Sequence, residues 1–341
     1  MKRRHLFSNA AITALFVSVF FIFEISFIGC TAKALAQSPV ENQPSGPVTP
    51  IEPGQTTRSK VYFTADISPA GLAAVYNALG QQPSGRVAVK LSTGEPPNSN
   101  YLRPALIKDL VQSLNGTIVE SNTAYGGRRA STAFHKQVAK DHGFTDIAVV
   151  DILDEDGSIS LPVKGGTRLH ENFVGAHFAN YDYYVVLTHF KGHQMAGLGG
   201  AIKNISIGIA SSEGKAWIHT AGKSKTSPWG GEQNAFLDSM AEAGKSVVDS
   251  LNGKILYINV MNRLSIDCDC NGNPAAPDMH DIGILSSLDP VALDQACIDL
   301  VYAAPDGRSL IRRMESMNGI RTIDHGAEID LGSKAYELIK L

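Results

Sequence analysis

Residues 188–204, THFKGHQMAGLGGAIKN, place two histidines, two lysines and four glycines directly after the apolar run YYVVL. His189 and His193 are four residues apart, and a histidine suits proton transfer near neutral pH. Gly199 and Gly200 let the backbone approach a ligand closely. The segment is therefore either a substrate or metal site at the end of a strand, or a glycine-rich turn with incidental histidines.

Lys203 lies just beyond these glycines, where residues 201–209 can begin a helix. The free N–H groups and the dipole at the start of a helix favour an anion. A lysine in the first turn opposes that dipole unless an anion or a covalent partner compensates. Lys215 and His219 follow downstream. Taken together at a strand end, these residues favour a functional site over surface lysines on a turn.

Residues 267–281, DCDCNGNPAAPDMHD, offer thiol, imidazole and carboxylate groups, which together suit a transition metal. Cys268 and Cys270 are too few for a self-contained iron–sulfur cluster, which usually needs four thiolates. In an exported protein they could instead form a tight disulfide. Metal or cofactor ligation, a disulfide and ordinary turn structure all remain open. Cys297 falls on an apolar helical face and is expected in the core.

Two polar loops follow other expected strands, STGEPPNSNYLRP at 92–104 and NTAYGGRR at 122–129. The planar guanidinium group of arginine suits carboxylate or phosphate groups. These arginines could equally well be solvent-exposed charges on loops. The candidate binding residues in these loops are Glu95, Asn100, Arg103, Tyr125, Arg128 and Arg129.

Short apolar runs alternate with amphipathic stretches from residue 59 onward, which predicts an α/β fold with a mostly parallel sheet and flanking helices. Ser68-Pro69 and Asp289-Pro290 each indicate an N-cap followed by a first-turn proline. In such folds ligands bind at the carboxyl ends of strands. The expected strands are residues 61–65, 87–91, 117–121, 147–153, 183–190 and 255–260. The expected helices are residues 69–79, 103–114, 131–141, 233–250 and the helix that Asp289 caps.

The first 36 residues are typical of an export signal, with a positive start, an apolar stretch and a small-residue cleavage site. Arg3 and Arg4 fit a twin-arginine signal, and general secretion is the alternative. Cys30 ends a loose lipobox and is a candidate for lipidation. We therefore expect a periplasmic or cell-envelope protein.

Residues 37–58 are rich in proline, glycine, serine and threonine, which predicts a disordered tether. Residues 59–341 are expected to form one domain, with a soft boundary near 225–232 that could divide it into two lobes. The formal net charge is −3 and no basic stripe is present in the sequence, so we expect no nucleic-acid partner. Contact with a membrane is expected only through the N-terminal signal or a lipid.

Several of these stretches, together with GKAWIH, DIGILSSLDPVALDQACIDLV and the closing IDLGSKAYELI, resemble the domain-of-unknown-function family 362 over roughly residues 60–341. Many members of that family carry an inserted ferredoxin module after the GK…H stretch. This chain has SKTSPWGGEQNAFL there and no Cys-x-x-Cys, so no inserted module is expected. The reaction of the family is not generally established, and the resemblance does not supply a function.

His193, a glycine pair, Lys203 and His219 are also similar in spacing to the core of the nickel-pincer lactate racemases. The resemblance implies a lactate-racemase-like fold, an acid/base role for His193, a pyridinium-derived cofactor on Lys203 and nickel ligation by His219. Residues 100–104, NYLRP, resemble that family's D-x-x-R-P loop, with Asn in place of Asp. Tyr125 and two arginines stand near the place of the second catalytic histidine, which puts two-base racemisation in doubt.

We therefore expect an exported enzyme with His193, Lys203 and His219 at its catalytic centre. It would act on a small anionic substrate by proton or hydride transfer, as an oxidoreductase or an isomerase. The cofactor would be a transition metal (nickel or iron) or an organic group linked to a lysine. The expected substrate-binding residues are Asn100, Arg103, Tyr125, Arg128, Gly199 and Gly200, and the expected metal ligands are Cys268, Cys270 and His219. The alternative is a non-catalytic envelope lipoprotein that binds a small anion or a metal ion.

Overall fold

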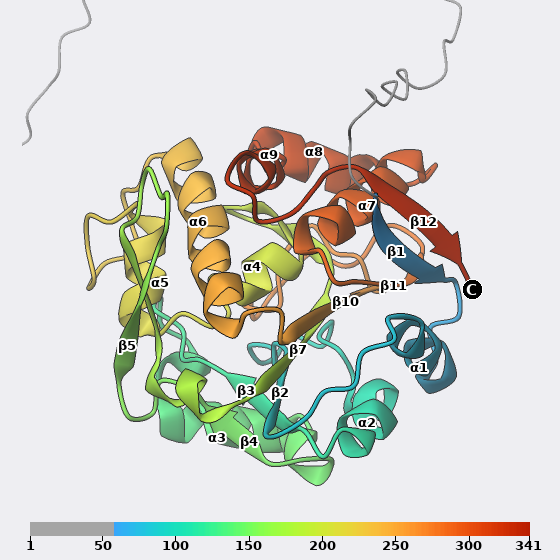
Figure 1. Cartoon of the computed structure of the whole chain (residues 1–341), viewed down its shortest axis with the longest axis horizontal. Helices are drawn as coiled ribbons and strands as arrows, with labels where there is room; N and C mark the ends of the chain where they lie inside the picture. The colour runs from blue at the N-terminus through green and yellow to red at the C-terminus, as the bar shows by residue number, and fades with distance from the viewer. Residues whose placement is uncertain (1–57) are drawn as a thin grey trace, which may run out of the picture. The chain divides into compact units, whose positions relative to one another are not determined.

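A mixed sheet of eight strands organises the part of the chain that the structure describes, residues 58–341 (Figure 1). In this computed structural model the strands lie in the order β12-β1-β11-β10-β7-β2-β3-β4. Seven strands point the same way, and β11 runs antiparallel to both of its neighbours. The strands are β1 (Ser59–Thr64), β2 (Val87–Lys90), β3 (Thr117–Glu120), β4 (Val150–Ile152), β7 (Tyr183–His189), β10 (Ile255–Met261), β11 (Gly283–Ser287) and β12 (Tyr336–Lys340).

Helices cover both faces of this sheet, and the alternation of side chains along each strand divides the core between them. In β2, Val87 and Val89 pack in a cluster with three helices of one face, whereas Ala88 belongs to the cluster on the other face. The first face is covered by α1 (Pro69–Ala78), α2 (Pro104–Ser113) and α3 (Thr132–Asp141). The second is covered by α4 (Ala201–Ile205), α6 (Gln233–Leu251) and α7 (Pro290–Ala303), with α8 (Arg308–Ser316) and α9 (Arg321–Glu328) packed beyond them.

Two small antiparallel hairpins lie outside the main sheet. β5 (Ser158–Pro162) pairs with β6 (Glu171–Gly175), and α5 (Ser212–His219) packs against this pair. β8 (Lys191–His193) pairs with β9 (Gly197–Gly199) directly after β7. The second hairpin folds the histidine- and glycine-rich segment back over the end of β7, so α4 begins close to that strand. Three short 3-10 turns complete the fold: Arg128–Ala130, Phe144–Asp146 and Ala176–Asn180.

The predicted α/β fold with a mostly parallel sheet and flanking helices is confirmed. Each of the six expected strands overlaps an observed one, and both predicted helix starts carry their caps. The Ser68 hydroxyl accepts a hydrogen bond from the Gly71 amide (3.1 Å), and the Asp289 carboxylate accepts from the amides of Val291 and Ala292 (2.9 and 3.0 Å). The sequence prediction missed β11, β12, the two hairpins and the helices α5, α8 and α9.

The boundary expected near 225–232 falls in the connection that precedes α6, and Thr56–Leu341 make up one compact unit. The expected export signal at 1–36, Cys30 and nearly all of the expected tether at 37–58 lie outside the described residues. Among the residues that are described, no helix has both the length and the apolar character needed to cross a membrane.

Asp289 does more than cap α7, and this gives a stability prediction. Its second carboxylate oxygen accepts hydrogen bonds from the Ser59 hydroxyl (2.7 Å) and the Ser333 amide (2.8 Å). We expect Asp289→Ala to lower the free energy of unfolding by about 2 kcal/mol, at the upper end for a lost cap, and Ser68→Ala by about 1 kcal/mol. Urea denaturation of both variants measures the difference. Equal losses would show that the contacts with Ser59 and Ser333 add no stability.

Candidate functional site

A pocket lies at the carboxyl ends of β2, β3 and β7, where parallel pairing brings the loops that follow these strands together. The β9–α4 segment, α5 and the loop after β10 complete its wall. Its charged and ionisable lining residues are Lys90, Glu120, Arg129, His189, Lys191, Lys203, Lys215 and Asp269. Other lining residues include Tyr125, Thr188, Gly199, Gly200, Cys268 and Cys270.

Four lysines line this pocket, and three of them have strongly lowered pKa values. Burial lowers the pKa of Lys90 to about 7, although its ammonium group donates hydrogen bonds to the Leu91 carbonyl (2.7 Å) and to Asn204. Burial, followed by the charges of the neighbouring lysines, also lowers the pKa of Lys203 to about 7. Burial lowers the pKa of Lys215 to about 8. These amines can therefore gain or lose a proton close to neutral pH.

The carboxylates of the pocket are already paired with other groups. Glu120 accepts hydrogen bonds from Arg129 (2.6 Å) and lies 3.0 Å from the His135 ring, and the Arg129 charge holds its pKa well below the usual range against the effect of burial. Asp269 pairs with His189 (2.9 Å) and with Lys191 (3.0 Å). In the described part of the chain, Lys191 is the only one of the four lysines with a carboxylate within 4.0 Å. The pocket therefore holds an excess of positive charge.

His193 and His219 present different nitrogen atoms. The Nδ1 of His193 accepts hydrogen bonds from the amides of Met195 (3.1 Å) and Ala196 (2.9 Å), so the ring proton is on Nε2. The Nδ1 of His219 donates to the Lys215 carbonyl (2.6 Å), which leaves a lone pair on Nε2. Burial and then the Lys203 charge lower the pKa of His193 well below its usual range, so that its ring is neutral.

Of the three expected catalytic residues, Lys203 lines the pocket, and His193 and His219 are not among its lining residues. Burial is the main cause that lowers the pKa of His219 to about 4, and the charges of Lys203 and Lys215 contribute to this shift. Because the Lys203 charge also acts on His193, the two rings lie within electrostatic range of one amine. The ring of His219 stacks on Phe236 and meets the edge of Tyr125, which fixes its plane.

The expected substrate-binding residues divide into two groups. Tyr125, Gly199 and Gly200 line the pocket. Asn100, Arg103 and Arg128 do not: Arg103 bonds the Tyr101 hydroxyl and the Ser99 carbonyl, and Arg128 lies exposed at 3.8 Å from Asp141. Arg129 lines the pocket instead and is 2% exposed.

The expectation that α4 offers free amides to a bound anion is wrong. The buried carboxylate of Asp294 accepts hydrogen bonds from the amides of Ala201 (2.7 Å) and Ile202 (2.9 Å), so the protein supplies its own anion there. A Cβ at Gly200 would lie 2.3 Å from this carboxylate, which explains the glycine. The helix also ends at Ile205 rather than reaching Ile209.

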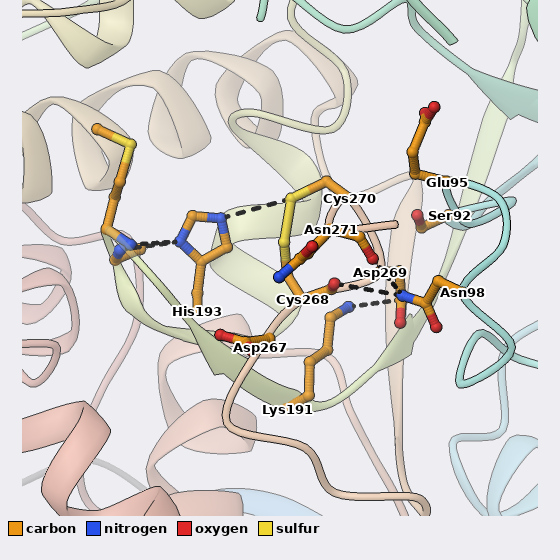
Figure 2. Close-up of a disulfide and its surroundings, with 12 residues drawn as sticks. Ser92, Glu95, Asn98, Lys191, His193, Asp267, Cys268, Asp269, Cys270 and Asn271 are labelled. Atoms are coloured by element: carbon orange, nitrogen blue, oxygen red, sulfur yellow. Dashed lines mark hydrogen bonds and ion pairs between the residues drawn. A yellow bond between two sulfur atoms is a disulfide. The ribbon is translucent and has the colours of Figure 1, made fainter. Parts of the chain in front are cut away.

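Cys268 and Cys270 form a disulfide in the loop after β10 (Figure 2). A ring nitrogen of His193 and the two sulfurs lie within 4.8 Å of one another, the one metal-binding grouping found among the described residues. His219, expected as a metal ligand, is not part of this grouping. Because the thiolate is the metal-binding form of cysteine, a metal would need the bridge to be reduced.

A family model described as "Domain of unknown function (DUF362)" matches residues 87–299. The chain belongs to this family. The match covers β2 to α7 and so includes every element that lines the pocket. No curated protein matches this DUF362 chain in sequence.

Two solved structures are partly similar to the DUF362 chain. One is the lactate racemase apoprotein from Thermoanaerobacterium thermosaccharolyticum, with 16% identity over 59% of this chain and 50% of the racemase and a TM-score of 0.38. The other is a protein from Thermotoga maritima, with 11% identity over 76% of this chain and 58% of that protein and a TM-score of 0.38. The chain thus spans about half the length of the racemase, and no reaction follows from likeness at this level.

Sequence reasoning overlooked Lys90 and Glu120 as pocket residues. Both are the last residues of short buried strands, Lys90 in VAVK and Glu120 in TIVE. A single charged residue that ends an otherwise apolar parallel strand is the signal that could have found them, because that end faces the ligand site.

The pairing of Asp269 gives a second stability prediction. Removing one partner of a buried ion pair typically costs about 3–5 kcal/mol, so we expect Asp269→Asn to be strongly destabilising at pH 7. The pKa of Asp269 is lowered by His189 and Lys191, so its contribution is present above the unfolded pKa near 4 and is lost as the pH falls below it. The difference between the variant and the wild type should therefore shrink below about pH 4.

Urea denaturation across this pH range measures the effect. The control is Glu155→Gln, which removes the carboxylate of an exposed pair with Lys136 and should cost about 0–1 kcal/mol. Equal losses from the two variants would contradict the role given to Asp269.

Proposed function

We propose that this DUF362 protein is an enzyme that binds a small organic anion in the pocket and transfers a proton on it. The observation that carries the proposal is the excess of buried positive charge at Lys90, Lys203 and Lys215. Unpaired buried charge is costly, and an anionic ligand would offset that cost. A carboxylate or a phosphate group is the natural counter-charge for such a cluster.

The chemistry follows from amines that titrate near pH 7. The neutral amine of Lys203 can take a proton from a carbon next to a carboxylate, since a base works best when its pKa lies near the working pH. The other cations of the pocket would stabilise the negative charge that develops on the substrate. His193 with its N–H and His219 with its lone pair would supply a proton donor and a proton acceptor within electrostatic range of this amine.

A cofactor is compatible with the same residues. An unprotonated amine at Lys203 is a nucleophile that could carry an organic group, and the free Nε2 of His219 suits nickel or iron. A lysine-linked group of this kind would supply a hydride acceptor when bound. Intact mass and metal analysis of the natively exported protein test this part: added mass on Lys203 or a stoichiometric metal supports it, and an unmodified, metal-free chain contradicts it.

Substitution of Lys203 tests the proposed anion site. A hydrogen bond to a charged group is worth about 1.5–3 kcal/mol, so we expect Lys203→Met to weaken the binding of oxalate or malonate by about 10- to 100-fold. The control is Lys136→Met, which removes an exposed lysine outside the pocket and should leave the affinity unchanged. Titration calorimetry measures both variants. Equal affinities for Lys203→Met and the wild type would remove Lys203 from the site.

Binding of the anion is expected to take up protons. At pH 7.5 Lys90 and Lys203 are partly deprotonated, because their pKa values are about 7. A bound anion favours the ammonium form and raises both pKa values, so the complex holds more protons than the free protein. Calorimetry in two buffers with different ionisation enthalpies counts these protons. Release of protons, or no change, would contradict an anion held by these lysines.

Carbon–deuterium exchange separates the enzyme from a binding protein. In D₂O the wild type is expected to exchange the carbon-bound hydrogen next to the carboxylate of its substrate, and Lys203→Met is not. NMR of a panel of small hydroxy- and oxo-acids follows the exchange. Binding without exchange of any member would favour the alternative function, a non-catalytic envelope lipoprotein that binds a small anion or a metal ion.

We further propose that the protein is exported to the periplasm or the cell envelope. The motivation is the signal-like sequence of residues 1–36, with Arg3 and Arg4 as a twin-arginine pair and Cys30 as a lipid acceptor. Cell fractionation tests it. Arg3→Lys with Arg4→Lys should keep the protein in the cytoplasm, and Cys30→Ser should release it from the membrane fraction. Unchanged fractionation of both variants would support general secretion without lipidation.

A further inference from the structure

The Cys268–Cys270 disulfide forms part of the pocket wall and faces the lysine cluster. Cys268 is buried, whereas Cys270 is partly exposed and is therefore the more accessible of the two sulfurs. Figure 2 shows the bridge beside His193, with Lys191 below it. A disulfide in this position is open to a molecule that has entered the pocket.

The bridge contributes little to holding the fold together. It joins residues two positions apart in one loop, so it closes almost no chain and connects no separate elements. The loop is also anchored without it. Asp269, between the two cysteines, pairs through its side chain with His189 and Lys191, and its carbonyl accepts a hydrogen bond from the Glu95 amide (2.7 Å).

Further contacts fix the loop on either side of Asp269. The Cys268 carbonyl accepts hydrogen bonds from the Asn271 amide (3.0 Å) and the Asn98 side chain (3.4 Å). The Arg313 side chain donates to the Ile266 carbonyl (2.9 Å). None of these contacts uses sulfur, so the two cysteines would stay close together if the bridge were reduced.

A hydrogen-bond donor and two lysines lie around the same part of the molecule as the bridge. The Nε2–H of His193 lies 3.9 Å from the sulfur of Cys270, in position to donate a weak hydrogen bond. Lys191 and Lys203 line the same pocket as the two cysteines. Thiolates form and leave most readily beside an imidazole donor and lysine side chains.

We propose that the Cys268–Cys270 bridge is a redox-active disulfide that exchanges with a small thiol carrying a carboxylate. The inference rests on the proposed anion site, because the lysines would bind that carboxylate.

The thiolate of the ligand attacks the sulfur of Cys270 and the S–S bond breaks. Cys268 leaves with the electron pair and takes up the proton that the thiol released. A second thiol molecule then attacks the ligand sulfur of the mixed disulfide and frees Cys270. Two thiols become one disulfide, and the protein gains two electrons and two protons.

Three thiols of similar size and different charge test the proposal: mercaptoacetate, 2-mercaptoethanol and 2-mercaptoethylamine. Alkylation followed by peptide mapping locates the freed cysteines and gives the rate of reduction. The urea-unfolded chain is the reference, because there the ratio of rates reflects only the intrinsic reactivity of the thiols. We expect the ratio of mercaptoacetate to 2-mercaptoethanol to be at least about ten times higher in the folded protein than in this reference, and 2-mercaptoethylamine to be the slowest.

Variants separate the contributions of Lys203 and His193 to the reduction rate. Lys203→Met should bring the ratio of the mercaptoacetate rate to the 2-mercaptoethanol rate close to its value in the unfolded chain. His193→Leu should slow reduction by all three thiols, and His193→Gln, which keeps an N–H donor, should restore part of the rate. Cys297→Ala is the control, since this buried core thiol lies outside the pocket and its loss should leave the rates unchanged. Melting curves of each variant confirm that it is folded.

Two results would overturn the inference: reduction only after unfolding, or equal charge preference in the folded and unfolded chains. A double variant, Cys268→Ser with Cys270→Ser, keeps this outcome distinct from failure of the proposed function. If it binds oxalate as the wild type does while the native bridge is inert, the anion site stands and the redox role falls. If neither the double variant nor the wild type binds anions, the proposed function falls as well.

Discussion

The buried carboxylate of Asp269 is the contact on which the geometry of the pocket depends. It joins the end of β7, through His189 and Lys191, to the loop that follows β10. The other nitrogen of the His189 ring bonds the Asn262 carbonyl (2.6 Å), so the ring is held from both sides. Together with the contact between His189 and Asn262, this carboxylate ties the wall that carries the two cysteines to the end of the sheet.

Electrostatic balance explains why the pocket remains positive. Arg129 is neutralised by Glu120 and Glu95, and Lys191 by Asp269. Lys90 receives only neutral acceptors, a carbonyl and an amide oxygen. A buried lysine is tolerated when an opposite charge pairs with it or when it loses its proton. The pKa values near 7 of Lys90 and Lys203 reflect partial loss of the proton. An anionic ligand would pair with both amines and keep them charged.

The extent to which the sequence predicts this structure follows from the range of each interaction. Apolar runs and capping residues are local signals, and they correctly predicted six of the seven strands that point the same way, together with the starts of α1 and α7. The spacing of His193, Lys203 and His219 predicted a common centre, and of these three residues Lys203 lines the pocket. The cap of α4 could not be read in this way, because Asp294 lies more than 90 residues from the amides it binds.

Two neighbouring arginines also show that contacts between distant residues decide where a side chain lies. Arg128 and Arg129 have the same chemistry, yet a 3-10 turn sends one to the surface and the other into the core. Which of the two lines the pocket depends on Glu95 and Glu120, carboxylates that come from the loops and strand ends of β2 and β3. Only the paired strands bring these carboxylates to one place, so residue type alone could not decide between the two arginines.

The two histidines show how backbone contacts set the chemistry of a site. Both rings are buried and neutral, and their sequence contexts do not distinguish them. The turn after β8 directs two amides at one nitrogen of His193, whereas α5 directs a carbonyl at the equivalent nitrogen of His219. The first ring must then donate from Nε2 and the second must accept there. A proton donor and a proton acceptor therefore arise from one residue type, because the backbone groups around each ring differ.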